Sequence, residues 1–310
     1  GGDEFVLLLS NCSSQQAVQM AQRVLSRIAR PVDIQGQFNL PSASIGIAIY
    51  PDDGTDIDTL LLHADQAMYQ AKSDHLHSLQ LFSLEMNRRA QERVAMERAL
   101  RQALEQRQLT LHYQPQTTAD PVLTLHGVEA LARWSHPEWG AISPAQFIPL
   151  AEETGLIHPL TRWLVDEACT QLTAWRAAGL AVPHVALNLS GRSFHQKGFA
   201  QSISATLLQH GLSAQDLMLE ITESVVMDGR TVTQENIEQL SQQGFKLSLD
   251  DFGTGYSSLS YLKRLPLDQI KIDQGFVRDV LLDASDAAIA RSIIGLADSL
   301  GLSVIAEGVE

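Results

Sequence analysis

Cysteine is scarce in this sequence, which holds only two, Cys12 and Cys169. They lie far apart in the chain, and neither belongs to a CxxC pair. Zinc sites and disulfide frameworks depend on closely spaced cysteines, so the sequence argues against both. We interpret the two thiols as reduced and partly buried side chains.

The sequence also lacks a long apolar run and an excess of basic charge. No stretch approaches the roughly 20 consecutive apolar residues that a membrane span requires. Lysine and arginine together number 22, against 36 aspartates and glutamates, which gives a formal net charge of −14. Non-specific binding to DNA or RNA depends on a basic surface, so a nucleic-acid polymer is not an expected partner. A phosphate ligand would need metal cations to offset the acidic groups.

The residues that are present indicate a globular chain in two parts joined by a helix. Of its 310 residues, 45% are apolar and 19% are charged, a balance typical of folded proteins. In residues 1–82, hydrophobic spacing predicts helices over 14–29 and 59–72 and a strand over 43–50. Residues 83–107 contain no glycine or proline and are rich in charge, which predicts a connecting helix. The second domain is expected over 108–310.

From residue 108 onward, short apolar strands alternate with helical stretches. Such alternation indicates an α/β domain with a largely parallel sheet. A (β/α) TIM-like barrel truncated before its last strand is favoured over the alternative of an open sheet. The strands are expected over 109–114, 128–134, 185–190, 217–222, 246–251, 269–273 and 303–307. The helices are expected near 145–154, 158–179, 197–210, 231–243, 257–264 and 285–300.

Polar residues gather at the carboxyl ends of the predicted strands. In a barrel, this rim is where active sites form, because the loops that follow the strands converge there. Oxygen ligands suit hard cations such as Mg²⁺ or Mn²⁺, and a cation would relieve the repulsion between neighbouring carboxylates. The residues concerned are Glu129, Asn188, Glu220, Asp250, Asp251, Lys271 and Glu307.

The adjacent pair Asp250-Asp251 is the strongest single signal. Taken alone, an acidic residue at a strand end is usually a helix cap or a solvated charge. Two in succession cost repulsion, and here they precede FGTGYSS, whose two glycines allow a close approach to a ligand. The histidines of this region, His126 among them, show no HxH or HExxH spacing, so we interpret them as structural or surface residues.

Several motifs together resemble the EAL family of phosphodiesterases. Glu129-Ala130-Leu131, within VEALARW, is similar to the signature tripeptide, which would carry no weight alone. The resemblance covers about 200 residues and implies a barrel enzyme that opens cyclic di-GMP to linear pGpG. The other motifs, in order, are YQP, FIPLAEETGLI, LNLS, LEITES, LDDFGTGYSSLSYL, KID and VIAEGVE.

The resemblance also implies roles for individual residues. Two cations, Mg²⁺ or Mn²⁺, would be held by Glu129, Asn188, Glu220, Asp250 and Asp251. Catalytic roles fall to Glu129, Lys271, Glu307 and Glu223, the last by fixing the loop at 252–258. Substrate-binding positions are Gln114, Leu131, Arg133, Asp273 and Glu310. Arg133 can bond a phosphate with two parallel hydrogen bonds, and its alternative role is an ion pair with a neighbouring carboxylate.

The first domain resembles the carboxyl-terminal half of a GGDEF, or diguanylate cyclase-like, domain of the α+β class. The motifs are Gly1–Phe5, ASIGIAIYPDDG and HADQAMYQAK. Where the family continues with Gly-Arg-Asn, this chain has His75, Leu76 and His77, and the family's earlier metal ligand and guanine-binding residues are absent from the sequence. We therefore expect no cyclase activity, while GTP binding to this remnant is implied by the family.

The resemblance further implies pairing of the EAL domain with a second copy. It also implies a cytoplasmic location, with a parent protein that could be anchored at the inner membrane. Two other functions stay open. The domain could be a catalytically silent sensor that binds cyclic di-GMP, although such sensors typically lose metal ligands that this chain retains. More remotely, the helix at 83–107 could serve as a scaffold for partner proteins.

Overall fold

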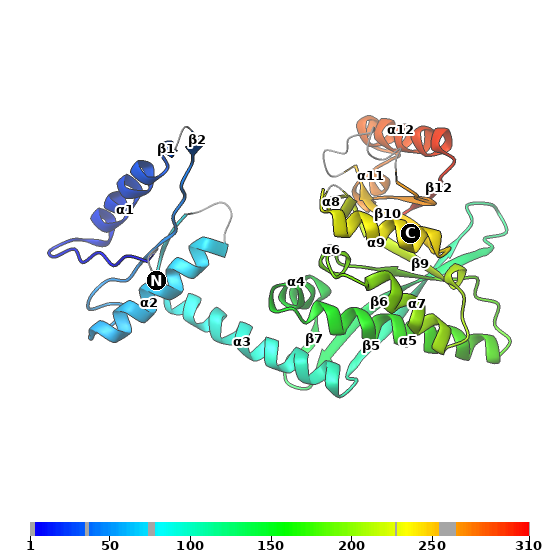
Figure 1. The fold of residues 1–310 in the computed structure, drawn as a ribbon, viewed down its shortest axis with the longest axis horizontal. Helices are drawn as coiled ribbons and strands as arrows, with labels where there is room; N and C mark the ends of the chain where they lie inside the picture. The colour runs from blue at the N-terminus through cyan, green and yellow to red at the C-terminus, as the bar shows by residue number, and fades with distance from the viewer. Residues whose placement is uncertain (1–3, 35–36, 74–77, 227, 254–264, 310) are drawn as a thin grey trace. The chain divides into compact units, whose positions relative to one another are not determined.

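The chain forms two compact units in a computed structural model that describes residues 4–34, 37–73, 78–226, 228–253 and 265–309. The units are Gly1–Met96 and Glu97–Glu310. The boundary between them falls inside helix α3 (Leu84–Glu105) (Figure 1). The helix expected at 83–107 is therefore present, and the domain limits inferred from composition stay a prediction.

In its described residues, the smaller unit contains helices α1 and α2, the first part of α3 and two small sheets. Strands β1 and β2 pair antiparallel, and β3 and β4 pair parallel. Helix α1 begins at a capping box in which Ser13 and Gln16 bond each other's backbone amides. Both predicted helices are confirmed, whereas the strand predicted over 43–50 is limited to three residues. The elements are α1 (Ser14–Ile28), β1 (Val32–Ile34), β2 (Gln37–Asn39), β3 (Ile45–Ile47), α2 (Ile57–Ser73) and β4 (Leu79–Leu81).

The larger unit is built on one curled sheet that forms a half-barrel (Figure 1). The strand order is β12-β11-β10-β9-β8-β6-β5, parallel from β6 to β12, with β5 antiparallel to β6. All seven predicted strands are present. They are β5 (Leu109–Thr117), β6 (Leu125–His136), β8 (Val185–Asn188), β9 (Leu217–Thr222), β10 (Lys246–Phe252), β11 (Gln269–Ile272) and β12 (Ser303–Ala306). The sequence did not predict β7 (Gly140–Ile142), a three-residue strand that pairs with β6.

The two faces of this sheet differ in chemistry because successive side chains of a strand point to opposite sides. One face packs into the hydrophobic core through residues such as Val185, Leu187, Leu247 and Leu249. The alternate positions form the inner face and carry polar side chains at Asn188, Glu220, Ser248, Asp250, Gln269 and Lys271. The fold thus separates an apolar core on one side of the sheet from a polar interior on the other.

Five predicted helices of this unit are confirmed, and the one expected at 257–264 lies outside the described residues. The five are α4 (Pro144–Thr154), α5 (Ile157–Ala177), α7 (Phe199–Gln209), α9 (Thr231–Gln242) and α12 (Ala284–Leu300). None of the helices in the described ranges is long and apolar enough to cross a membrane.

Among the described residues, four short helical segments were not predicted, because one helical turn is too short to show a hydrophobic period. Helices α6, α8 and α11 follow strands β8, β9 and β11 closely, so they lie beside the carboxyl ends of those strands. The segments are α6 (Gly191–Phe194), η1 (Ala214–Asp216), α8 (Glu223–Val226) and α11 (Gln274–Arg278).

Candidate active site and metal centre

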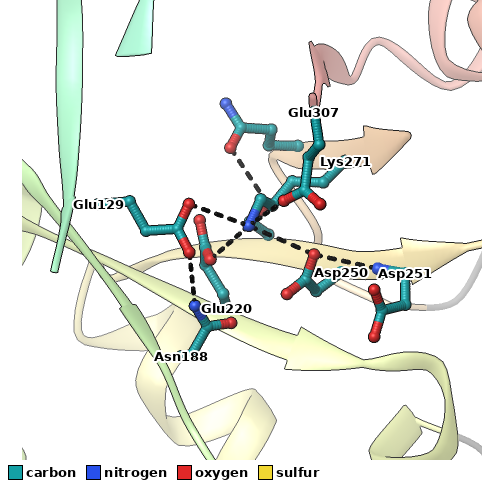
Figure 2. Close-up of polar contacts among 9 residues, drawn as sticks. Glu129, Asn188, Glu220, Asp250, Asp251, Lys271 and Glu307 are labelled. Atoms are coloured by element: carbon teal, nitrogen blue, oxygen red, sulfur yellow. Dashed lines mark hydrogen bonds and ion pairs between the residues drawn. The ribbon is translucent and has the colours of Figure 1, made fainter. Parts of the chain in front are cut away.

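Six neighbouring strands each deliver one polar side chain to the same rim of the sheet. Because the strands are parallel, their carboxyl ends meet at this edge, and Figure 2 shows the side chains pointing toward one another. Glu307 lies one residue beyond β12, where its amide still donates to the carbonyl of Ile272. The contributing residues are Glu129 on β6, Asn188 on β8, Glu220 on β9, Asp250 on β10, Lys271 on β11 and Glu307 after β12.

Lys271 lies at the centre of this cluster. Its Nζ is 2.6 Å from Glu307 Oε1 and 2.7 Å from Glu220 Oε2. The distances from Nζ to Asp250 Oδ1 and to Glu129 Oε2 are 3.3 and 3.4 Å. The lysine side chain is only 1% exposed, so these carboxylates replace the water that would otherwise solvate its charge.

Burial and neighbouring charges both shift the pKa values of these groups. Burial disfavours the ammonium of Lys271, but the carboxylates of Glu220, Asp250 and Glu129 outweigh it and raise its pKa. Burial raises the pKa of Glu220, and the negative charges of Glu129 and Asp250 add to that effect against the pull of Lys271. The pKa of the Glu307 carboxyl is likewise raised by burial. One ammonium is therefore not enough to offset the burial and mutual repulsion of the rim carboxylates.

A local break in β10 brings Asp250 and Asp251 to the same place. In a regular strand these neighbours would point to opposite faces. Here the register between β10 and β11 shifts between Leu249 and Phe252, and Asp251 has a φ of 55°. An irregularity of this kind re-aims side chains. As a result, ligand oxygens of Asp250, Asp251 and Glu307 lie within 4.8 Å of one another.

The donor set fits a hard divalent cation. Besides the Lys271 ammonium, which cannot bind a cation, the described groups that converge offer oxygen atoms of carboxylates and of one amide, the ligand type that Mg²⁺ and Mn²⁺ prefer. Asn188 donates through Nδ2 to Glu129 Oε1 at 2.7 Å, which leaves its amide oxygen for a cation. Glu220 Oε1 is fully buried and has no hydrogen-bond partner among the described residues. A buried carboxylate oxygen without a partner is costly, and a cation would satisfy it.

Three of the predicted substrate-binding residues line the neighbouring strands. Leu131 and Arg133 follow Glu129 at alternate positions of β6, so all three share one face. Gln114 on β5 lies directly opposite Glu129 in the ladder. The guanidinium of Arg133 donates to the carbonyl of Ala132 at 3.0 Å and forms no ion pair with a described carboxylate.

The other predicted residues lie at the edges of the site. Glu223 is the first residue of α8; it is buried, and its Oε2 has no partner in the described part of the chain. Most of the loop that it was expected to fix, 254–258, lies outside the described residues, as does Glu310. Asp273 caps α11 by accepting a hydrogen bond from the amide of Gly275 at 2.8 Å.

One supporting residue received no role from the sequence. Glu152 on α4 accepts a hydrogen bond from Ser190 Oγ at 2.6 Å, and its carbonyl accepts one from Arg192 Nη1, also at 2.6 Å. Both donors follow Asn188, so Glu152 holds the segment that carries this ligand. Glu152 lies within FIPLAEETGLI, one of the motifs of the family resemblance. The sequence around a carboxylate on a helix does not reveal, however, which distant side chain will bond to it.

Comparison with family models decides the classification of the chain. A model described as "EAL domain" matches residues 97–310, and a model described as "Diguanylate cyclase, GGDEF domain" matches residues 1–77. The chain belongs to the EAL domain family. Its EAL domain contains the whole rim cluster, and the resemblance drawn from the motifs is confirmed.

Relatives of known name agree with this classification. The chain is 47% identical over 310 residues to the bifunctional diguanylate cyclase/cyclic di-GMP phosphodiesterase MucR of Pseudomonas aeruginosa, matching all of this chain and 45% of the relative. It is 41% identical over 310 residues to the cyclic di-GMP phosphodiesterase PdeR of Escherichia coli, matching all of this chain and 46% of the relative. The chain thus spans somewhat less than half the length of these curated relatives.

Solved structures confirm the half-barrel fold of the EAL domain. A structure described as the PaMucR phosphodiesterase in complex with c-di-GMP aligns with a TM-score of 0.66 and 49% identity, covering 70% of this chain and 87% of that chain. The structure of the EAL enzyme Bd1971 in its cGMP-bound form aligns with a TM-score of 0.67 and 33% identity. The alignment covers 72% of this chain and 62% of that chain.

Proposed function

We propose that this EAL domain hydrolyses cyclic di-GMP to linear pGpG with the help of two divalent cations, Mg²⁺ or Mn²⁺. The observation that carries the proposal is the convergence of carboxylates from successive strands around the buried Lys271. The names of the relatives support the substrate, since MucR and PdeR are both cyclic di-GMP phosphodiesterases.

Charge balance supports the number of cations. Five carboxylates and one ammonium gather at the rim, which leaves four negative charges when every carboxyl is ionised. Two divalent cations would neutralise that excess and admit an anionic phosphodiester. Bound at this rim, they supply an acidified water and neutralise charge that develops on the phosphate.

The proposed roles follow from position. Glu129, Asn188, Glu220 and Asp250 hold one cation, and Asp250 and Asp251 hold the other. Lys271 fixes these carboxylates and donates toward the attacking water or a phosphate oxygen. Water adds to phosphorus, the bond from phosphorus to the 3′ oxygen breaks, Glu307 takes the proton that the water loses, and the released 3′ oxygen takes up a proton from solvent. Glu223 is assigned to the loop that follows Phe252.

Substrate contacts are assigned mainly to residues of β5 and β6 beside Glu129. Arg133 lies on the same face of β6 as Glu129, where its guanidinium can reach a phosphate. Leu131 lies between them on that face, and Gln114 is opposite Glu129 across the ladder. Asp273 and Glu310 complete the proposed substrate-binding set.

Other expectations belong to the same proposal. The GGDEF model matches residues 1–77, and for this part we propose GTP binding at most and no synthesis of cyclic di-GMP, because its sequence departs from the family's Gly-Arg-Asn. Its divergent positions His75, Leu76 and His77 lie outside the described residues. Pairing of the EAL domain with a second copy and a cytoplasmic location rest on family resemblance alone.

The test compares the chain with its Glu129→Ala variant in hydrolysis of cyclic di-GMP. We expect pGpG to form only with Mg²⁺ or Mn²⁺, and the variant to lose roughly 100-fold or more of this activity, since a ligand of the cation is removed. Glu138→Ala, at an exposed glutamate beyond the site, is the matched control. Tight binding of cyclic di-GMP without any product would instead favour the sensor function.

A further inference from the structure

A buried pair of polar side chains lies one layer beneath the acidic rim. Ser248 Oγ donates to Gln269 Oε1 at 3.1 Å, and the two residues are 0% and 1% exposed. Ser248 is two residues before Asp250 on β10, and Gln269 is two residues before Lys271 on β11. Because side chains two apart share a face, this pair lies directly below the contact between Asp250 and Lys271.

The pair forms one of the last two regular pairings between β10 and β11. Ser248 lies opposite Gln269 and Leu249 opposite Ile270, after which the pairing shifts so that Phe252 meets Ile272. The shift is what turns Asp250 and Asp251 toward the same site. The hydrogen bond between Ser248 and Gln269 therefore ties β10 to β11 immediately before the irregularity that positions both carboxylates.

Gln269 also reaches across the interior of the half-barrel. Its Nε2 is 3.5 Å from His126 Nε2, near the outer limit of a hydrogen bond. His126 lies on β6, three residues before Glu129, and its ring meets that of His184 edge to face at 5.2 Å. The Gln269 amide thus links the strands of Asp250 and Lys271 to the strand of Glu129.

We propose that Ser248 and Gln269 are positioning residues, which hold Asp250, Asp251 and Lys271 at the separation that binds the cations. The proposal deepens the proposed function, on which its hydrolysis readout rests, but its metal-binding readout is independent of the reaction. The competing explanation is that the pair merely satisfies two buried polar groups.

The two explanations differ in a double variant. Replacing one partner leaves the other buried without a hydrogen bond, whereas replacing both with apolar groups can be nearly neutral for stability. We therefore compare Ser248→Ala, Gln269→Met and the double variant in the full chain. The measurements are unfolding by urea in EDTA, Mn²⁺ affinity by calorimetry, and hydrolysis of cyclic di-GMP.

We expect each single variant to lose stability and to bind Mn²⁺ roughly 10- to 100-fold more weakly, as is typical for residues behind metal ligands. The double variant should regain most of the stability but not the Mn²⁺ affinity. A double variant with the Mn²⁺ affinity of the unmodified chain would overturn the proposal, as would an unmodified chain that binds no Mn²⁺.

The matched control is a hydrogen-bonded pair at the amino end of β9, away from the rim, where Ser213 Oγ donates to Asp216 Oδ2 at 3.0 Å. Ser213→Ala and Asp216→Asn should change stability and leave Mn²⁺ affinity unaltered. An equal loss of affinity in this control would show that Mn²⁺ binding follows stability alone, against the proposal. If the unmodified chain binds Mn²⁺ without hydrolysing cyclic di-GMP, the proposed function fails while the positioning roles are still decided by the affinities.

Discussion

Lys271 is the residue on which the electrostatics of the rim depend. It is the one ammonium in contact with four carboxylates in the described cluster, and it is buried almost completely. A buried charge network of this kind tolerates the loss of a partner poorly, because the remaining charges are left without compensation. Glu220 has no exposed surface, so without the ammonium its carboxylate would lack compensation from water as well.

We predict that Lys271→Met lowers the free energy of unfolding in EDTA by about 3–5 kcal/mol, the range for breaking a buried ion pair. Methionine keeps much of the side-chain volume, so the loss reports on charge. Added Mn²⁺ should recover part of it while hydrolysis stays absent. Urea unfolding with and without Mn²⁺ measures both effects. Lys246→Met, at the exposed start of β10, is the control. Equal stability of the two variants would contradict the role given to Lys271.

His184 is a second residue with a predictable charge effect. Burial lowers the pKa of its imidazole from 6.5 to about 4, and the nearby His126 and Lys246 act in the same direction. The unfolded chain takes up a proton as the pH falls below about 6.5, while the folded chain resists protonation until about pH 4. Stability should therefore fall as the pH drops through this window.

We predict that this loss is at most about 3.5 kcal/mol, since the pKa falls from 6.5 to about 4 and a change of one in pKa corresponds to about 1.4 kcal/mol. Urea unfolding between pH 4 and 7 measures it in EDTA. His184→Gln, which cannot titrate, should flatten the part of the pH dependence that belongs to this residue. An unchanged pH dependence in the variant would mean that His184 is protonated equally in the folded and unfolded chain.

At the scale of elements, the irregular end of β10 decides the geometry of the site. Asp251 adopts a left-handed backbone conformation, with φ at 55°, which disfavours residues with a Cβ atom. Two short helices, α6 and α8, begin just beyond the ligands Asn188 and Glu220 and turn the chain away from the rim. The strands place the ligand residues at the rim, and the irregular strand ends orient their side chains.

The left-handed conformation at Asp251 makes a direct prediction. Asp251→Gly and Asp251→Ala both remove the carboxylate, so both should weaken Mn²⁺ binding. Glycine accepts this conformation without cost, so Asp251→Gly should be more stable than Asp251→Ala by about 1 kcal/mol. Urea unfolding in EDTA measures the difference, free of any contribution from the cation. Greater stability of the alanine variant would show that the conformation is not retained.

At the scale of the whole molecule, the chain consists of two units, and only one of them contains the proposed cation site. The rim cluster lies entirely within Glu97–Glu310. In the smaller unit, Phe5, Val6, Leu7 and Leu8 are 72–91% exposed and belong to no strand in the described residues. A ligand that binds only one folded unit stabilises that unit alone.

We predict two transitions in thermal unfolding, of which Mn²⁺ raises only the one that belongs to the larger unit. At a concentration 100 times the dissociation constant, one bound cation adds about 2.7 kcal/mol to its stability. Asp250→Asn should remove the shift, and Asp279→Asn, at a half-buried carboxylate just after α11, should preserve it. Calorimetry resolves the transitions. A shift of both by the same amount would indicate that the units unfold together.

The smaller details of the fold show where sequence patterns stop being informative. The strands and the long helices of the larger unit were predicted, because hydrophobic period and length are local properties. The one-turn helices and β7 were not, since three to five residues show no period. Residues 43–50 read as a full strand, but only Ile45–Ile47 pairs, because a strand extends only as far as its partner, here Leu79–Leu81.

The sequence by itself determined the family, the alternation of strands and helices, and the identities of the acidic residues at the strand ends. Only the tertiary structure decided how those residues meet. It placed Lys271 among four carboxylates, turned Asp250 and Asp251 to one side against the alternation of a regular strand, and paired Ser248 with Gln269 and Glu152 with Ser190. The physical reason is that local spacing sets which face a residue occupies, whereas contacts between distant segments depend on strand register, and register is settled by packing of the whole sheet.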